Sequence, residues 1–273
     1  MRWRDRGVEI KTPEQIDLMR RAGLVVGETL DLLRGSARAG MTTADLDALA
    51  EDSIRSAGAV PSFQGYQGFP ASICTSVNDE VVHGIPGRRV LADGDVVSID
   101  CGAIVEGWHG DAAVTLAIGE VSEEVTGLMR VTEDALWAGI AAARQDGRVT
   151  DISHAVERHV RARGNYGIVE DYVGHGIGSA MHQPPNVPNQ GRRGRGPTLV
   201  PGLALAVEPM VTLGGAAVDV LDDDWTVVTR DGLPAAHFEH TFTLTPEGIW
   251  VLTALDGGRA RLADLGAPYG GPA

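Results

Sequence analysis

Two helices followed by several strands are predicted twice along this chain, and this repeated order constrains the fold more than any other feature. In the first half, helices are predicted from Thr12 and after Thr42 or Thr43, and strands at 72–77, 96–101 and 112–118. In the second half, helices are predicted near 122–144 and 150–163, and strands near 203–207, 225–229 and 237–244. The repeat indicates an α+β fold in which two similar halves pack as one domain, with a site where their sheets meet.

The start of the first helix is the best-defined local signal. Thr12 suits the N-cap, Pro13 the first helical position and Gln15 the third, where its side chain can complete a capping box. Ile16 and Met19 begin an apolar stripe. We therefore predict an amphipathic helix that begins directly after Thr12.

Charge and cysteine content exclude several classes of protein. Lys plus Arg number 23 and Asp plus Glu 37, a net charge of −14, which argues against a broad nucleic-acid-binding surface and a DNA partner. Cys74 and Cys101 form no CxxC pair, so neither a disulfide framework nor a cysteine-rich metal site is expected. The N-terminal residues lead into no apolar segment, and no stretch approaches the length of a membrane span. We therefore expect a cytoplasmic protein without a membrane partner.

Two aspartates are predicted to face each other across a hairpin. Asp100 lies on the polar face of its strand, and a four-residue loop at 104–107 would place Asp111 directly opposite, with Cβ atoms about 5 Å apart. Such carboxylates repel unless one is protonated or a cation lies between them, and two-metal hydrolases use bridging carboxylates. The pairing favours a metal site, although a single aspartate on a strand can also cap a turn or face solvent.

Two glutamates in the second half extend this acidic set. Alternation in the segment HFEHTFTL puts His237, Glu239 and Thr241 on one face of a strand. Glu208 follows the apolar run LALAV and ends a strand that should be buried, where a carboxylate needs a partner. Both glutamates are candidates for the same acidic site.

The segment GHGIGSAMHQPP has the glycines of a nucleotide-binding loop, but Pro184 and Pro185 prevent the helix that such a loop must open. The glycines instead let the backbone approach a crowded centre around His175, with His182 pointing into the same cleft. Taken singly, these histidines and His83 can also be structural residues. No GxSxG, P-loop or HExxH motif occurs, which leaves oxygen-rich metal hydrolysis.

The ordered set of Asp100, Asp111, His175, Glu208 and Glu239 resembles that of the methionine aminopeptidases of the pita-bread fold. The phrases VVHGIP, SIDCGA, GDAAVT, GHGIG, AVEPM and FEHT also occur in the order typical of that family. The resemblance implies a fold of two pseudo-symmetric halves, with helices outside a curved antiparallel sheet.

The extent of the resemblance leads to an expected domain organisation. A single catalytic domain should span 12–255, with halves at about 12–120 and 121–255. Residues 1–11 would form an N-terminal extension, and the loose composition of the last residues predicts a flexible tail at 256–273.

By the same resemblance, the five residues would bind two divalent metal ions, with Co, Mn, Fe and Zn as the candidates. Asp100 and Asp111 would each bind in bidentate or bridging fashion. His175 and Glu208 would complete one metal site, and Glu239 would bridge both ions.

The resemblance also implies three catalytic residues. His83 would contact the substrate near its amino end, and His182 would hydrogen-bond the scissile amide and stabilise the tetrahedral intermediate. Glu208 would also relay protons.

A methionine pocket would be built from flexible, polarisable and aromatic side chains, which suit a thioether. The candidates are Tyr66, Phe69, Cys74, Met181 and Trp225. Taken singly, each of them is better explained as ordinary core.

The implied activity is removal of the initiator methionine from nascent polypeptides when the second residue is small. Only 31 residues separate Glu208 from Glu239, which leaves no room for the helical insertion of type II members and fits the bacterial type I form. We expect a monomer. A prolidase or proline aminopeptidase on the same fold is the first alternative, and a non-enzymatic module that binds peptides, histones or RNA is the second.

Some positions depart from the family pattern. Gln183 replaces a common glutamate, Gln190 stands where an aromatic residue or valine is usual, and His237 replaces a common glutamine. The arginine-rich loop at 191–197 could contact ribosomal RNA near the exit tunnel, although a solvated surface loop is the better explanation.

Overall fold

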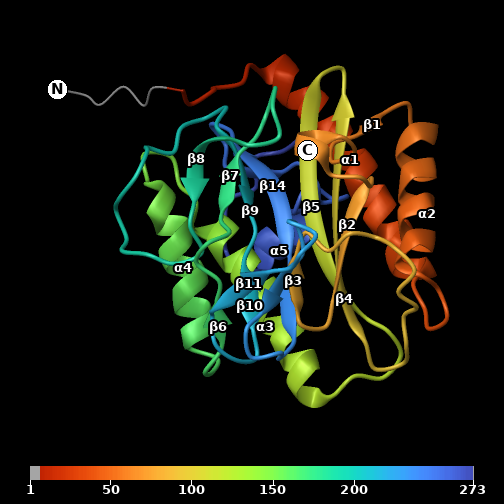
Figure 1. Cartoon of the computed structure of the whole chain (residues 1–273). Helices are drawn as coiled ribbons and strands as arrows, with labels where there is room; N and C mark the ends of the chain where they lie inside the picture. The colour runs from red at the N-terminus through yellow and green to blue at the C-terminus, as the bar shows by residue number, and fades with distance from the viewer. Residues whose placement is uncertain (1–6, 273) are drawn as a thin grey trace.

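The computed structural model describes residues 7–272, and it contains the two predicted pairs of helices (Figure 1). The helices are α1 (Pro13–Ser36), α2 (Thr43–Ser56), α3 (Glu123–Ala142), α4 (Val149–Arg161) and the short α5 (Arg259–Asp264). A 3-10 turn spans Tyr66–Gly68. The capping box of α1 is confirmed, because the Thr12 side chain accepts from the backbone N–H of Gln15 and the Gln15 side chain accepts from that of Thr12.

Most strands belong to one antiparallel sheet. The strands are β1 (Val60–Pro61), β2 (Ile73–Val77), β3 (Glu80–Val82), β4 (Val96–Val105), β5 (Trp108–Ala117), β6 (Gly167–Ile168), β7 (Gly174–Gly176), β8 (Gln183–Val187), β9 (Ala204–Val207), β10 (Met210–Thr212), β11 (Val218–Val220), β12 (Val227–Thr229), β13 (Ala235–His237), β14 (Glu239–Leu244) and β15 (Ile249–Val251). Nine form the main sheet in the order β1-β4-β5-β14-β9-β7-β8, with β2 beside β4 and β15 beside β14. Smaller sheets have the orders β13-β10-β6 and β11-β12-β3.

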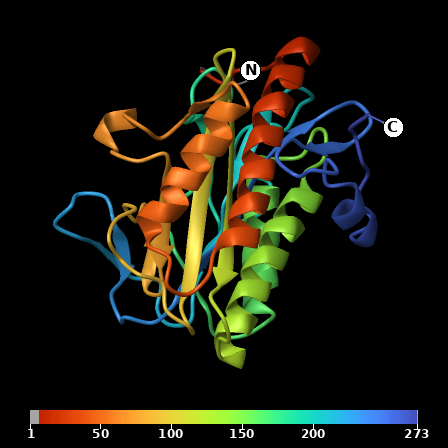
Figure 2. The same cartoon turned by 90° about the vertical axis from the view of Figure 1, so that its right-hand side faces the viewer.

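The long helices cover one face of the main sheet and leave the other face for the site. Figure 2 shows α1, α2 and α3 side by side in front of the strands. The core between these layers is apolar and includes Leu33, Leu46, Ile99, Leu136 and Ile140, all buried. This arrangement confirms the α+β class, with helices outside an antiparallel sheet.

Glycines allow α1 to lie directly on the strand that carries Asp111. A Cβ atom on Gly110 would lie 2.7 Å from the backbone nitrogen of Gly23 in α1, a distance that real Cβ atoms do not reach. Gly110 therefore requires glycine, because the backbone of α1 is too close for a side chain at this position, and Gly23 requires it because a Cβ atom there would collide with the Leu252 carbonyl. The rear of the site is a rigid contact between helix and sheet.

The register predicted for the β4–β5 hairpin is wrong by two residues. Val105 pairs with Trp108, so the turn contains only Glu106 and Gly107, which have φ angles of 50° and 86°. Positive φ at both turn positions is typical of the two-residue hairpin turn that suits the twist of the strands. Asp111 consequently faces Gly102, and Asp100 faces Ala113. Because the error is an even number of residues, both aspartates still point to the same face of the sheet.

The strand predicted at 237–244 is two strands. β13 ends at His237 and pairs with β10, whereas β14 begins at Glu239 and pairs with β5 and β9. The chain changes partners at Phe238, so alternation does not relate His237 to Glu239. Similarly, Trp225 precedes β12 and lies in a turn, where its backbone N–H donates to Asp223.

Both terminal segments pack on the domain. Of the expected N-terminal extension at 1–11, residues 1–6 lie outside the described part of the chain, while Ile10 pairs with Leu203. The prediction of a flexible tail at 256–273 is wrong through residue 272. Leu262 of α5 is fully buried, and the Ile249 N–H donates to the Pro268 carbonyl at 2.9 Å. The glycine-rich composition suggested a loose tail because it does not reveal these distant partners.

Within residues 7–272, no helix is both long enough and apolar enough to cross a membrane.

Burial of the C-terminal segment makes a prediction about stability. Leu262→Ala should lower the free energy of unfolding by about 2 to 4 kcal/mol, because it leaves a cavity under α5. Leu265→Ala, at a side chain that is 48% exposed, should have little effect. Urea denaturation measures the free energy of unfolding of both variants. If neither substitution changes it, the C-terminal segment is not held against the domain.

Candidate metal centre

Five predicted ligands come from five neighbouring positions of the main sheet. Asp100 lies on β4, Asp111 on β5, Glu239 on β14 and His175 on β7, while Glu208 directly follows β9. All five line one cavity of about 160 Å³. The structure therefore brings together side chains that are up to 139 residues apart, because adjacent strands carry them on the same face.

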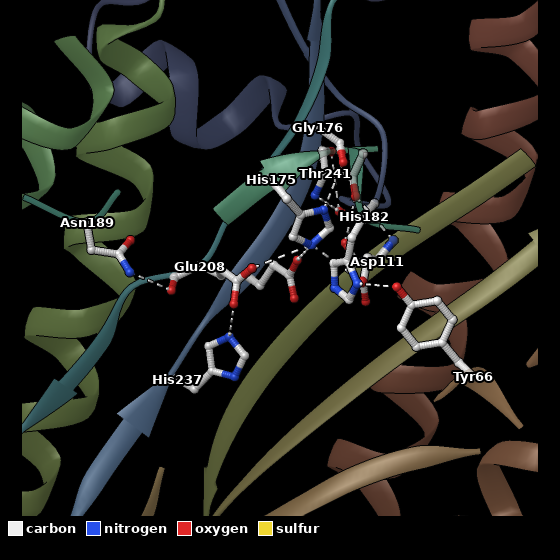
Figure 3. A network of polar contacts seen from close by, with 11 residues as sticks. Tyr66, Asp111, His175, Gly176, His182, Asn189, Glu208, His237 and Thr241 are labelled. Carbon is white, nitrogen blue, oxygen red and sulfur yellow. Dashed lines mark hydrogen bonds and ion pairs between the residues drawn. The ribbon is translucent and has the colours of Figure 1, made fainter. Parts of the chain in front are cut away.

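His175 lies at the centre of the carboxylates (Figure 3). Its Nε2 is 3.5 Å from Glu208 Oε1, 3.9 Å from Glu239 Oε1 and 4.0 Å from Asp111 Oδ2. These separations are too long for good hydrogen bonds. They match the spacing of atoms that share a cation, since two ligands each about 2.1 Å from one ion lie roughly 3 to 4 Å apart.

The tautomer of His175 is determined by its backbone. Nδ1 lies 3.0 Å from the Gly176 carbonyl oxygen, which only accepts, so Nδ1 carries the proton. Burial, together with the nearby His182, lowers the pKa of His175 to about 3, so the ring is neutral. Nε2 therefore presents a lone pair to three carboxylates, as a metal ligand does.

The carboxylates are strongly perturbed by their surroundings. Burial raises the pKa of Asp100 from 3.8 to about 7. Burial also raises the pKa values of Asp111, Glu208 and Glu239, and the neighbouring carboxylates raise them further. Each group is thus held where its charge is unfavourable unless a proton or a cation compensates for it.

The donor set fits divalent cations. Buried oxygen atoms of three carboxylates have no hydrogen-bond partner: Asp100 Oδ1, Asp111 Oδ1 and Glu239 Oε1. Among residues 7–272, the ion-pair contacts of the five side chains involve only histidines, with no lysine or arginine. One buried cluster, Asp111, His175 and Glu239, offers ligand atoms that all lie within 4.8 Å of one another. Oxygen-rich sites with one imidazole suit first-row divalent ions.

Neighbouring polar groups hold the ligands in place. The Thr241 hydroxyl accepts from the backbone N–H of Asp111 at 3.1 Å and donates to its carbonyl at 2.8 Å. The Asn189 side-chain amide donates to the Glu208 carbonyl at 3.1 Å. His237 is buried and its Nε2 lies 3.8 Å from Glu208 Oε2, so this departure from the family pattern borders the site directly (Figure 3).

An apolar wall adjoins the acidic centre. The predicted pocket residues Tyr66, Phe69, Cys74, Met181 and Trp225 all line the cavity and pack in one cluster. The rings of Phe69 and Trp225 meet edge to face, with centroids 5.0 Å apart. The cavity therefore combines an acidic end with an apolar end.

Two further histidines border the cavity. His83 has a φ of 61°, a left-handed conformation that is unusual for a residue with a side chain, and burial lowers its pKa to about 4. His182 is exposed at the rim, and its Nδ1 lies 2.9 Å from the Tyr66 hydroxyl. Its ring meets that of His175 edge to face, with centroids 4.4 Å apart.

The remaining sequence departures lie away from the ligands. Gln183 contacts Lys11, and Gln190 is partly buried. The arginine-rich loop at 191–197 lines no part of the cavity. It is anchored on α4, where Gly194 donates to Asp151, and its arginines face solvent.

Comparison with known proteins identifies the family. The model of metallopeptidase family M24 matches residues 17–246. The methionine aminopeptidase of Clostridium acetobutylicum is 55% identical over 245 residues, which cover 89% of this chain and 98% of that protein. The chain belongs to metallopeptidase family M24, and within it to the methionine aminopeptidases.

Solved structures agree with this M24 assignment and confirm the resemblance seen in the sequence. The methionine aminopeptidase from Thermotoga maritima superimposes with a TM-score of 0.89 at 41% identity, covering 90% of this chain and 99% of that one. Prolidase from Pyrococcus furiosus shares only the fold, with a TM-score of 0.73 at 20% identity. This chain covers 65% of that prolidase.

Sequence reasoning missed several residues of the M24 site. Phe63 and Gln67 line the cavity, and the aromatic and glycine-rich segment around them was the available signal. Asn189 and Thr241 support the ligands through backbone groups. Nothing in the local sequence indicates such contacts, because the backbone partners belong to other strands.

The raised pKa of Asp100 predicts a pH dependence for the metal-free protein. Between about pH 4 and 7 the folded state retains a proton that the unfolded state releases, so this contribution to stability is present at low pH and lost as pH rises. The unfolding free energy of wild type minus that of Asp100→Asn should fall with rising pH, by up to about 1.4 kcal/mol per pH unit. Urea denaturation of both proteins in EDTA, repeated across this pH range, measures the difference in unfolding free energy. A difference that stays constant from pH 4 to 7 would show that Asp100 titrates normally.

Proposed function

We propose that the protein removes the N-terminal methionine from polypeptides by hydrolysis that depends on two divalent metal ions. The observation that carries the proposal is the neutral His175, whose Nε2 lone pair faces three buried carboxylates, with no lysine or arginine of residues 7–272 paired with them. Membership of the methionine aminopeptidase branch of family M24 supports the choice of substrate.

Five side chains would hold the ions. Glu239 and Asp111 are central to the cluster, Asp100 and Glu208 extend it on either side, and His175 contributes Nε2. When bound, divalent ions in such a site lower the pKa of water and polarise the carbonyl of the scissile bond. Co, Mn, Fe and Zn remain the candidate metals, since these ligands suit all four.

The apolar wall would bind the methionine side chain. Met181 and Cys74 present sulfur atoms, and Phe69 and Trp225 present aromatic edges, which favour contact with a thioether. A methionine side chain bound against this wall would place the backbone of the substrate's first residue at the acidic end of the cavity. The α-amine then lies among carboxylates, which explains a preference for the free N-terminus.

His182 and His83 would act on the substrate itself. Because His182 Nδ1 is engaged by the Tyr66 hydroxyl, Nε2 is the nitrogen left to hydrogen-bond the scissile amide. The left-handed backbone of His83 directs its ring toward the same cavity, where it would contact the amino end of the substrate. Glu208 would carry a proton between water and the leaving amine, consistent with its raised pKa.

Loss of one ligand should remove metal and activity together. In Asp111→Asn we expect metal affinity to fall and kcat/KM for Met-Ala-Ser to fall by at least about 100-fold, because a carboxylate at the centre of the cluster is neutralised. Titration calorimetry with Mn²⁺ and a peptide assay measure the two effects. Asp219→Asn, at an exposed strand position, is the matched control. Full activity in a variant with quantified metal would contradict the assignment of Asp111.

A small second residue should be required. The methionine side chain would occupy the apolar end of the cavity, and we expect the narrow space beyond the scissile bond to exclude bulky side chains. We expect Met-Ala-Ser to be cleaved at least about 100-fold faster than Met-Arg-Ser, with little cleavage of Xaa-Pro-Ala. Mass spectrometry of the released residue tests this order. Preference for the proline peptide would favour a prolidase-like activity instead.

A further inference from the structure

Lys11 is a buried charged residue that the proposed mechanism does not use. It lies in the N-terminal segment, two residues before α1 begins, and its side chain is 1% exposed. The preceding residue, Ile10, is 49% exposed, so burial is particular to the lysine. Burial lowers the pKa of Lys11 and the Glu9 carboxylate opposes this effect. A buried ammonium group is tolerated only where specific partners surround it.

Those partners form a closed polar network. Lys11 Nζ lies 3.5 Å from the Glu9 carboxylate, 3.1 Å from the Glu9 carbonyl and 3.3 Å from Gln183 Oε1. The Glu9 carboxylate accepts from the Ser179 backbone N–H at 3.1 Å and from its hydroxyl at 2.8 Å. The Gln183 amide completes the ring by donating to the Ser179 hydroxyl at 3.1 Å. We call Glu9 and Lys11 the N-terminal clamp.

The clamp holds the loop that carries His182. This loop joins β7, which contains His175, to β8, which begins at Gln183. In Figure 1 the N-terminal segment passes near the top of the molecule, where this loop also lies. Ser179 and Gln183 lie on either side of His182 in sequence, so the clamp contacts the loop on both sides of it, through the Ser179 backbone N–H and the Gln183 side chain.

Gly178 shows how closely the clamp fits the loop. A Cβ atom at this position would collide with the Lys11 side chain and with the Glu9 carboxylate. On its other side the Gly178 carbonyl accepts from the His109 backbone N–H at 3.0 Å. The loop is therefore in contact with β5 on one side and with the N-terminal clamp on the other.

We propose that Lys11 and Glu9 are positioning residues that hold His182 at the mouth of the cavity. The clamp holds the loop that carries His182 through Ser179 and Gln183, and the Tyr66 hydroxyl holds the His182 ring through Nδ1. Neither clamp residue lines the cavity, so neither touches the substrate. The proposal rests on the proposed function only for the role of His182 in catalysis.

Lys11→Met tests the clamp, because it keeps the apolar stem and removes the ammonium group. We expect kcat for Met-Ala-Ser to fall about tenfold or more, because a small displacement of a catalytic group is costly, while KM and Mn²⁺ affinity change less than about twofold. Ile10→Ala, in the same segment but exposed, is the control with unchanged kinetics. A fall in kcat that merely follows the folded fraction, or a matching loss of Mn²⁺ affinity, would overturn the proposal.

A relocated carboxylate provides a rescue experiment. Glu9→Gln should lower kcat, because the Lys11 amine loses its counter-charge. Adding Gln183→Glu returns a carboxylate to the position 3.3 Å from the amine, so Glu9→Gln with Gln183→Glu should recover most of the kcat lost. The two substitutions together leave the net charge of the chain unchanged, and Lys11 itself is not altered and stays buried. No recovery in a folded double variant would count against the clamp.

NMR signals of the imidazole groups in the metal-free protein distinguish a failure of this proposal from a failure of the proposed function. The Hε1–Cε1 NMR signal of His182, assigned with His182→Gln, should shift or broaden in Lys11→Met and Glu9→Gln and return in the double variant. If wild type fails to cleave Met-Ala-Ser but these signals behave as expected, the proposed function fails and the clamp stands. If the His182 signal is unchanged in both single variants, the clamp is wrong whatever the activity.

Discussion

Four carboxylates are held in one buried cavity, and the packing of the fold has to oppose their mutual repulsion. Asp100, Asp111, Glu208 and Glu239 lose hydration there, and burial and their neighbours raise their pKa values. A fold can hold such a cluster only if rigid elements prevent the side chains from moving apart. The main sheet meets this need, because its central strands carry the candidate ligands and α1 packs against its rear, with direct backbone contact at Gly110.

The two ends of the cavity have opposite chemistry, and this contrast gives the site its direction. Under the proposed function, the acidic end would bind cations and the α-amine of a peptide, and the apolar wall of aromatic and sulfur-containing side chains would bind an unbranched apolar side chain. His182 lies at the rim between solvent and the acidic end. In the proposed function, these three parts would select the residue type, the free terminus and the bond to be cleaved.

The agreement between sequence and structure varies with the range of the interactions. The capping box at Thr12 and the helix pairs were predictable, because caps and apolar periodicity act within a few residues. The register of the β4–β5 hairpin was not, because it depended on left-handed φ angles at Glu106 and Gly107 that allow a two-residue turn. The change of strand at Phe238 and the packing of residues 256–272 depended on partners far along the chain.

By itself, the sequence determined which residue types were available and in what order, and the ordered acids and histidines were enough to indicate the family. Alternation along each strand also determined that Asp100 and Asp111 share a face, since an even shift of register leaves the face unchanged. Only the tertiary structure decided the distances around His175, the tautomer of its ring and the supports from Thr241 and Asn189. It also decided that Lys11 reaches the His182 loop. The physical reason is that these contacts join strands and loops distant in sequence, and their geometry follows from how the sheet and helices pack rather than from local preference.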